Sequence, residues 1–258
     1  MNQFYSYLIP SFFIFTTISL CNDLPLCSIC LQSITEEYSV DAWGNPFHRK
    51  HEKEGIFCHS CSRIISQEIT QGGYRYKDGR HICSLCQVSI VVDDPMINVS
   101  YKSVITQFES IGIHNFPNNI NIQLIDLIDL NNKFGIQKHG GLKGVTHTGN
   151  HYDLEPQYTI FILSGLPKIE FEAVLAHELL HIWLYDNKYH LNQKETEGFC
   201  NLGSQLIYKK NGTHFSKIHL QAMENDPHLI YGDGYRKMNA VLRESNWKNL
   251  LNNLHSFE

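Results

Sequence analysis

The sequence predicts an α+β protein in two parts, on three observations. Residues 23–92 are rich in Cys and His and hold only short strand-like pieces separated by turns such as Gln71-Gly72-Gly73. Residues 96–258 hold longer periodic segments, and the pattern over residues 169–185 is helical. The β-branched and aromatic run over residues 158–163 is typical of a strand. We therefore expect a small ribbon-like module followed by a larger domain of helices and strands.

Other segments of the larger domain are less uniform. Residues 120–130 fit either a strand or a helix, because they mix alternation with an apolar run. The Gly-rich residues 139–144 are expected to form a loop. A second helix is expected over residues 195–209, ended by Asn211-Gly212, and a third from about residue 235 into the C-terminus. Asp93-Asp94-Pro95 is expected to be the linker between the two parts.

The composition excludes some classes of partner. The chain has 258 residues, of which 42% are hydrophobic and 18% charged, as in globular proteins. Its net charge of −5 at pH 7 gives no reason to expect nucleic acid or an anionic membrane as a partner. We expect neither as a partner.

The N-terminus predicts an export signal. Residues 8–20 are mostly apolar and uncharged, too short to span a bilayer as a helix but suited to the core of a signal peptide. No Lys or Arg precedes the run, no small-residue cleavage site follows it, and bulky Leu20 disfavours lipid attachment at Cys21. We expect residues 1–22 to be a signal and the protein to be periplasmic, secreted or membrane-anchored, with no other membrane-spanning segment. The alternative is a buried N-terminal strand or helix in a cytoplasmic protein.

Eight metal-ligand residues of the first part occur as four pairs, each with two residues between its members. The pairs are Cys27 and Cys30, His48 and His51, Cys58 and Cys61, and Cys83 and Cys86. Zinc prefers four Cys or His ligands at tetrahedral corners, and a two-residue spacer lets one turn present two of them. The pattern predicts two structural zinc ions. Three disulfides are the alternative, which the His pair in the expected gap disfavours.

The order of these pairs resembles the LIM domain, a double zinc module in which the first two pairs bind one metal and the last two the other. Two features differ: the fourth ligand is His51 instead of the usual Cys, and the gap to the fifth ligand is longer. The longer gap leaves open which of His48, His51 and His59 bind zinc. The resemblance implies a module that recognises a protein partner and performs no chemistry itself.

The second part contains His177-Glu178-Leu179-Leu180-His181. Histidines four residues apart lie on one face of a helix and can hold one zinc ion, while the Glu between them reaches a zinc-bound water as general base. The flanking residues are apolar, so the helix should be buried, and buried imidazoles need partners. This motif predicts a catalytic zinc bound by His177 and His181, with Glu178 as the catalytic base.

A third protein ligand is expected from the next helix. Glu197 stands at its start, and zinc peptidases of the gluzincin type take a Glu from such a helix; the Glu-Gly-Phe context also resembles zinc aminopeptidases. Glu195 is the alternative, although an acid at a helix start is commonly solvated. Residues 158–163 are expected to be the edge strand that pairs with an extended peptide substrate, and a core strand fits them equally well.

Residues 231–236 read Tyr-Gly-Asp-Gly-Tyr-Arg. Tyr231 is taken as a catalytic residue that donates to the oxyanion of the tetrahedral intermediate, with His228 and Arg236 as alternatives. A Gly-rich turn that caps the last helix is the structural alternative. Cys200 is expected to be a small core residue.

Four blocks resemble the LIM peptidases of the DA-related (DAR) family, ubiquitin-activated enzymes that restrict plant organ growth. They are residues 159–167, 175–184, 197–200 and 231–236. A LIM module ahead of the peptidase is also the order of that family. The resemblance implies a gluzincin-like metallopeptidase domain over residues 96–258, with zinc at His177 and His181 and Glu178 as the base. Plant members carry ubiquitin-interacting segments before the LIM module, and here only the predicted signal precedes Cys27, so ubiquitin control is not implied. The Asn-, Ile- and Lys-rich composition suits a bacterial relative.

The function expected is hydrolysis of peptide bonds in protein substrates by zinc-activated water. The alternative is a non-catalytic, zinc-stabilised LIM scaffold that binds proteins, and a third reading is a disulfide-rich secreted binding protein without metal. The complete motif and the Glu that follows favour the enzyme, because a site that no longer catalyses usually loses the residue equivalent to Glu178.

Overall fold

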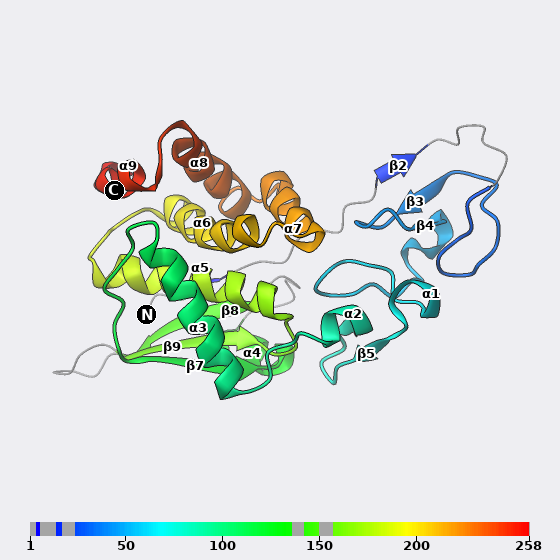
Figure 1. The fold of residues 1–258 in the computed structure, drawn as a ribbon, viewed down its shortest axis with the longest axis horizontal. Helices are drawn as coiled ribbons and strands as arrows, with labels where there is room; N and C mark the ends of the chain where they lie inside the picture. Colours follow the sequence, from blue (N-terminus) through cyan, green and yellow to red (C-terminus); the bar gives the residue numbers. More distant parts are fainter. Residues whose placement is uncertain (1–3, 6–13, 17–23, 136–141, 150–156, 258) are drawn as a thin grey trace. The chain divides into compact units, whose positions relative to one another are not determined.

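The computed structural model describes residues 4–5, 14–16, 24–135, 142–149 and 157–257. The chain divides into two compact units. We call residues 10–90 and 165–167 the cysteine-rich unit, and residues 1–9, 91–164 and 168–258 the mixed unit. The combination of helices and sheet confirms the predicted mixed fold class (Figure 1).

The mixed unit contains a four-stranded sheet in the order β1-β8-β9-β7. Its strands are β1 (Phe4–Tyr5), β7 (Ile120–Ile125), β8 (Gly144–Gly149) and β9 (Gln157–Leu163). β9 runs parallel to β7 and antiparallel to β8, and β8 is antiparallel to β1. The strand predicted over residues 158–163 is therefore confirmed as β9, but it lies inside the sheet. The expectation that it forms the edge that pairs with substrate is wrong, because β7 and β8 occupy its two sides.

Helices form the rest of this unit. They are α3 (Asp94–Glu109), α4 (Leu127–Phe134), α5 (Lys168–Asp186), α6 (Gln193–Asn211), α7 (His214–Asn225), α8 (Tyr231–Glu244), α9 (Trp247–Asn252) and the short η2 (Leu254–Phe257). Helix α5 packs on β8 and β9 on one side and on α6 on the other, and α8 covers α6 (Figure 1). The core thus lies around α5.

Helix α5 is buried from residue 170 to residue 184, as its apolar sequence predicts. A helix that is apolar on all sides needs cover on all sides, and the sheet and α6 supply it. Helix α6 begins where Asn192 caps the amides of Lys194 and Glu195, and it ends at Gly212, whose φ of 66° suits a glycine. Both helices agree with the sequence-based bounds to within two residues.

Three other expectations need correction. Asp93-Asp94-Pro95 is no linker: the Asp93 side chain caps α3 by accepting from the Met96 amide, and Pro95 occupies its first turn. Residues 120–130 form a strand and then a helix, because the Asp126 side chain caps α4. The last long helix starts at Tyr231 instead of about residue 235, so the Gly-rich block is part of a helix and no capping turn.

The cysteine-rich unit is built of short elements. Its strands are β2 (Ile14–Thr16), β3 (Tyr38–Val40), β4 (Pro46–His48), β5 (Gly73–Arg75) and β6 (His81–Cys83), and its helical turns are η1 (Arg49–Glu52), α1 (Gln67–Thr70) and α2 (Ser84–Gln87). β2, β3 and β4 form one antiparallel sheet, and β5 and β6 form a hairpin. The expected ribbon-like hairpins are present. Its small core includes Ile34, Phe47 and Ile64 together with Cys27.

The predicted signal falls mostly on residues outside the described part of the chain. Of residues 1–22, the structure describes the strands β1, paired with β8, and β2, paired with β3. Among the described helices, none has the length and apolar character needed to cross a bilayer. Of the Gly-rich segment 139–144, residues 139–141 lie outside the described part, and Gly144 begins β8.

Candidate metal centres

The histidines of the 177–181 motif face each other on α5. His177 Nε2 and His181 Nε2 are 3.0 Å apart, and their rings meet at 70° with centroids 4.8 Å apart. This is the arrangement expected of residues four apart on one helix face. Both side chains are buried.

Helix α6 brings Glu197 to the same point. Glu197 Oε2 lies 3.3 Å from His177 Nε2 and 3.7 Å from His181 Nε2. Glu195, two residues earlier, does not reach the histidines: it is buried and accepts a hydrogen bond from Lys237 of α8. Of the two acids weighed from the sequence, the structure groups Glu197 with the histidines.

The geometry and charge of this group fit a zinc ion. Tetrahedral zinc with N and O ligands at about 2.0–2.1 Å places ligand atoms about 3.3 Å apart, close to the distances of 3.0, 3.3 and 3.7 Å found here. Burial lowers the pKa of both histidines, so the imidazoles are neutral ligands, and burial raises the pKa of Glu197 well above its usual value. A divalent cation would compensate the buried carboxylate that neutral imidazoles leave unbalanced.

Asn201 orients one of these ligands. Its Oδ1 lies 3.0 Å from His177 Nδ1 and can only accept, so the imidazole donates from Nδ1 and keeps the Nε2 lone pair for a metal. The Asn201 amide also donates to the backbone carbonyl of Tyr231 at 3.5 Å. Sequence analysis missed Asn201, although its position four residues after Glu197 places it on the same face of α6.

Glu178 is fully buried beside the histidines. Its carboxylate accepts a hydrogen bond from Thr146 Oγ1 of β8 at 2.8 Å. Thr146 was also missed, because no local pattern links it to a residue 32 positions away.

The three oxyanion-donor candidates of the C-terminal region differ in their surroundings. His228 Nδ1 accepts from the backbone amides of Ile230 and Tyr231, at 3.2 and 3.4 Å. Arg236 binds Asp233 and the carbonyls of Glu224 and Asp226. Both side chains thus hold the start of α8 in place. Tyr231 is buried in the first turn of α8 and is tied to the metal group through Asn201.

The glycines around Tyr231 serve helix packing. A methyl group on Gly198 of α6 would lie 2.2 Å from the carbonyl oxygen of Gly234, and one on Gly234 would lie 2.3 Å from that of Lys194. Only glycines let α6 and α8 approach this closely. The Glu-Gly-Phe and Tyr-Gly-Asp-Gly blocks are therefore two sides of one helix contact.

A pocket of about 720 Å³ opens beside His181. Its lining includes Tyr158, Tyr185, Asp186, Tyr189 and His190. Tyr158 donates to Asp186 across it at 3.4 Å. Cys200, predicted to be a core residue, is fully buried, and burial raises the pKa of its thiol, which confirms that expectation.

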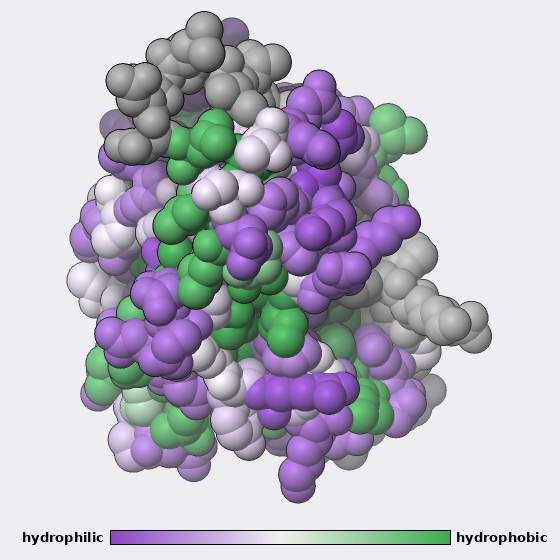
Figure 2. All heavy atoms as spheres, turned by 90° about the vertical axis from the view of Figure 1, so that its right-hand side faces the viewer, coloured by the Kyte–Doolittle hydropathy of each residue, from purple (hydrophilic) through white to green (hydrophobic). Residues whose placement is uncertain are grey.

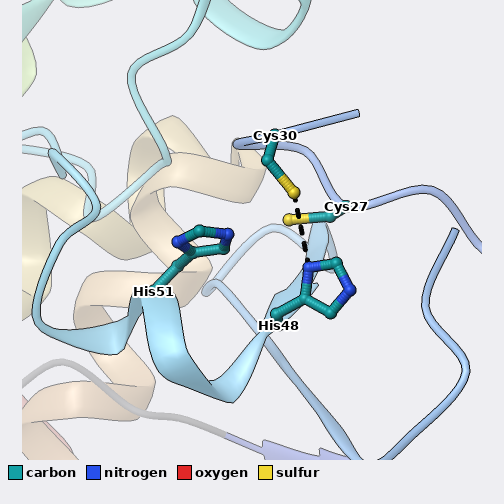
Figure 3. Close-up of side chains that lie close together, drawn as sticks. All are labelled: Cys27, Cys30, His48 and His51. Carbon is teal, nitrogen blue, oxygen red and sulfur yellow. Dashed lines mark hydrogen bonds between the residues drawn. The ribbon is translucent and has the colours of Figure 1, made fainter. Parts of the chain in front are cut away.

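In the cysteine-rich unit, the side chains of Cys27, Cys30, His48 and His51 point toward one another (Figure 3). Cys30 Sγ lies 3.4 Å from His48 Nδ1. His51 pairs its Nδ1 with Glu54 at 3.0 Å, and its buried Nε2 takes no hydrogen bond from any described residue. An imidazole fixed through one nitrogen with the other aimed at two thiols fits a zinc ligand. His59 is not part of this group.

A second group is formed by Cys58, Cys61, Cys83 and Cys86, all of which are buried. Cys61 Sγ and Cys83 Sγ are 3.7 Å apart, close to the separation of about 3.8 Å for thiolates on tetrahedral zinc. Hydrogen bonding from Cys61 lowers the pKa of Cys58, and hydrogen bonding from Cys58 raises the pKa of Cys61, as expected of thiols that lie against one another. The seven cysteines that the structure describes are free of disulfides, against the disulfide alternative.

Comparisons with known proteins place these groups in context. Residues 123–217 match the family model DA1-like, described as Protein DA1. The chain is 26% identical over 297 residues to Protein DA1-related 1 of Arabidopsis thaliana, covering 85% of this chain and 52% of that protein. It is 26% identical over 222 residues to Protein DA1-related 2 of the same plant, covering 70% and 42%. It is also 23% identical over 310 residues to the LIM domain-containing protein HDR3 of Oryza sativa subsp. japonica, covering 89% and 60%.

The matches support a relationship to the DA1 and DA1-related proteins. They agree with the resemblance drawn from the motifs, and the name of the rice protein agrees with the LIM-like order of the Cys and His pairs. The chain spans about half the length of the curated relatives it matches. No solved structure matches it.

Proposed function

We propose that the mixed unit is a gluzincin-like zinc peptidase that hydrolyses peptide bonds of protein substrates. The observation that carries the proposal is the meeting of His177 Nε2, His181 Nε2 and Glu197 Oε2 within 3.7 Å of one another, with Glu178 buried next to them. Three protein ligands leave a fourth position for water, as in catalytic zinc sites.

The residues divide the chemistry among them. His177, His181 and Glu197 would hold the ion, which when bound polarises the scissile carbonyl and acidifies water. Glu178 takes the proton of the attacking water and passes it to the departing amine. Tyr231 is proposed as a donor to the oxyanion. The aromatic pocket beside His181 would receive a substrate side chain.

A cleavage assay tests this function. Purified protein is incubated with a denatured protein mixture, and new N-termini are identified by mass spectrometry. Wild type should produce them, and Glu178→Ala should produce none while its zinc content stays the same. Cleavage by Glu178→Ala at the wild-type rate would contradict the mechanism, and no cleavage by wild type would favour the non-catalytic scaffold.

Zinc content also tests the metal assignment. Three groups of ligands predict about three zinc ions per chain, one catalytic and two structural. About two would indicate a scaffold held by the cysteine-rich clusters, and none would exclude both readings.

We further propose that the cysteine-rich unit binds a protein partner. Large apolar side chains of this unit are exposed, namely Leu24, Leu26, Leu31, Ile56, Tyr74, Leu85 and Val88. Figure 2 shows a face on which hydrophobic residues form a band bordered by hydrophilic ones. Exposed apolar patches with polar rims are typical of protein interfaces.

The N-terminal apolar run and the composition support two further proposals. We propose that it directs export, which fractionation of a bacterial host expressing the whole chain tests by the compartment in which the protein accumulates. The composition supports a bacterial relative of the DA1-related proteins.

A further inference from the structure

Strand β8 passes along α5 at the level of Glu178. Gly144 and Thr146 are two residues apart on this strand, so they lie on the same face. Both are buried, and both approach the Glu178 side chain. The metal ligands and the base come from two helices, whereas this contact comes from the sheet.

Thr146 holds one carboxylate oxygen. Its Oγ1 lies 2.8 Å from Glu178 Oε2 and 3.2 Å from the Glu178 backbone oxygen. A hydroxyl has one proton to donate, and the closer, charged acceptor makes the stronger bond. The Thr146 and Glu178 side chains are 2% and 0% exposed, so water does not compete for this bond.

Gly144 bounds the other oxygen. A methyl group at this position would lie 2.9 Å from Glu178 Oε1, 3.0 Å from Glu178 Cγ and 2.6 Å from Val174 Cγ1. Any larger residue would have to displace the Glu178 carboxylate, the Val174 side chain or the strand. The space that Glu178 occupies thus exists because residue 144 has no side chain.

We propose that Gly144 and Thr146 form a socket that holds the Glu178 carboxylate in one orientation, and that both act as positioning residues for the general base. The inference rests on the proposed peptidase function. A base must lie within hydrogen-bond reach of the water it deprotonates, and a displacement of about 1 Å can cost on the order of 100-fold in rate. The threonine hydroxyl gives up no proton in the reaction, because its hydrogen bond serves orientation alone.

Thr146→Val tests the socket, since valine keeps the shape and removes the hydroxyl. We expect kcat to fall roughly 10- to 100-fold with little change in KM, because only the base moves. Thr146→Ser should restore most of kcat. Zinc content should stay at the wild-type value in both variants, because the Thr146 hydroxyl bonds to Glu178, which is not one of the proposed ligands.

Ser204→Ala is the matched control. Ser204 Oγ donates to the carbonyl of Ala173 on the same helix α5 at 2.7 Å, so it is also a buried hydroxyl that ties a neighbouring element to α5. The Ser204→Ala variant should have a lower melting temperature, while its kcat stays at the wild-type value. If kcat of Ser204→Ala falls as far as that of Thr146→Val, the effect of Thr146 is a general loosening of α5. That result would overturn the proposal that Thr146 positions Glu178.

A second pair of variants tests the glycine. Gly144→Ala should lower kcat, because the added methyl group crowds both Glu178 and Val174 and leaves the carboxylate less room to keep its orientation. Gly149→Ala is its control on the same strand, where the nearest atom to an added methyl group is the Gln157 carbonyl oxygen at an ordinary 3.7 Å. Equal activity in the two variants would contradict the proposal.

Binding of acetohydroxamic acid, measured by calorimetry, gives a readout independent of turnover. Its hydroxyl proton is accepted by the general base when its oxygens bind zinc, so Thr146→Val should weaken binding roughly 10-fold, about 1.4 kcal/mol. Unchanged binding and unchanged kcat in Thr146→Val, with an active wild type, would overturn the socket alone. A wild type that neither cleaves peptides nor binds the hydroxamate would overturn both the socket and the peptidase function.

Discussion

The three candidate ligands of the mixed unit lie on long helices, whereas the eight of the cysteine-rich unit lie on turns and short strands. Helices α5 and α6 are packed over their length against each other and against the sheet or α8. The cysteine-rich unit has a core of a few side chains, one of which is the candidate ligand Cys27. A small core stabilises little, so on the proposed function bound metal would supply folding free energy in the cysteine-rich unit, whereas in the mixed unit it would supply chemistry alone.

The largest expected effect is in the cysteine-rich unit. Cys83→Ser should remove one zinc ion and unfold the surrounding hairpin and turns, because a structural zinc supplies about 10 kcal/mol or more of binding free energy. Hydrogen exchange should show loss of amide protection over residues 58–86 and retained protection in α5 and α6. Full amide protection of both regions would contradict the idea that the cysteine-rich unit depends on metal for its folding.

The next largest effect is expected at the proposed catalytic centre. His181→Ala should also remove one zinc ion and abolish peptide cleavage, but it should leave the amide protection of α5 and α6 close to that of wild type. The packing of these helices holds them without metal. A variant that keeps about three zinc ions would refute the ligand assignment, and unfolding of the mixed unit would erase the distinction between the two kinds of site.

A smaller effect is expected at Asn201. Asn201→Ala should weaken zinc binding at the catalytic centre roughly 10- to 100-fold, because His177 loses the acceptor that orients its ring. Asn201→Asp, which keeps an acceptor oxygen, should bind zinc close to wild type. Competition with a chromogenic chelator measures both, and equal affinities for the Ala and Asp variants would exclude the orienting role.

Local patterns predicted a large part of this protein. The two members of each Cys or His pair lie together as their two-residue spacing indicates, because one turn is enough to set such a pair. His177 and His181 face each other because helical periodicity alone places residues four apart on one face. The apolar residues on all sides of this motif predicted the burial of α5, because a helix without a polar face needs cover on every side.

Tertiary structure decided what lies far apart in the sequence. The choice of Glu197 over Glu195 depends on which side of α6 packs on α5, and the contacts of Asn201 and Thr146 join separate elements. Strand order placed β9 inside the sheet, which no pattern within residues 158–163 indicates. The sequence by itself determined the candidate ligand pairs and the His177–His181 arrangement, because these depend on a few residues' own geometry. Only packing decided which acid lies beside the two histidines and which residues surround Glu178, because the position of one element against another depends on all the side chains between them.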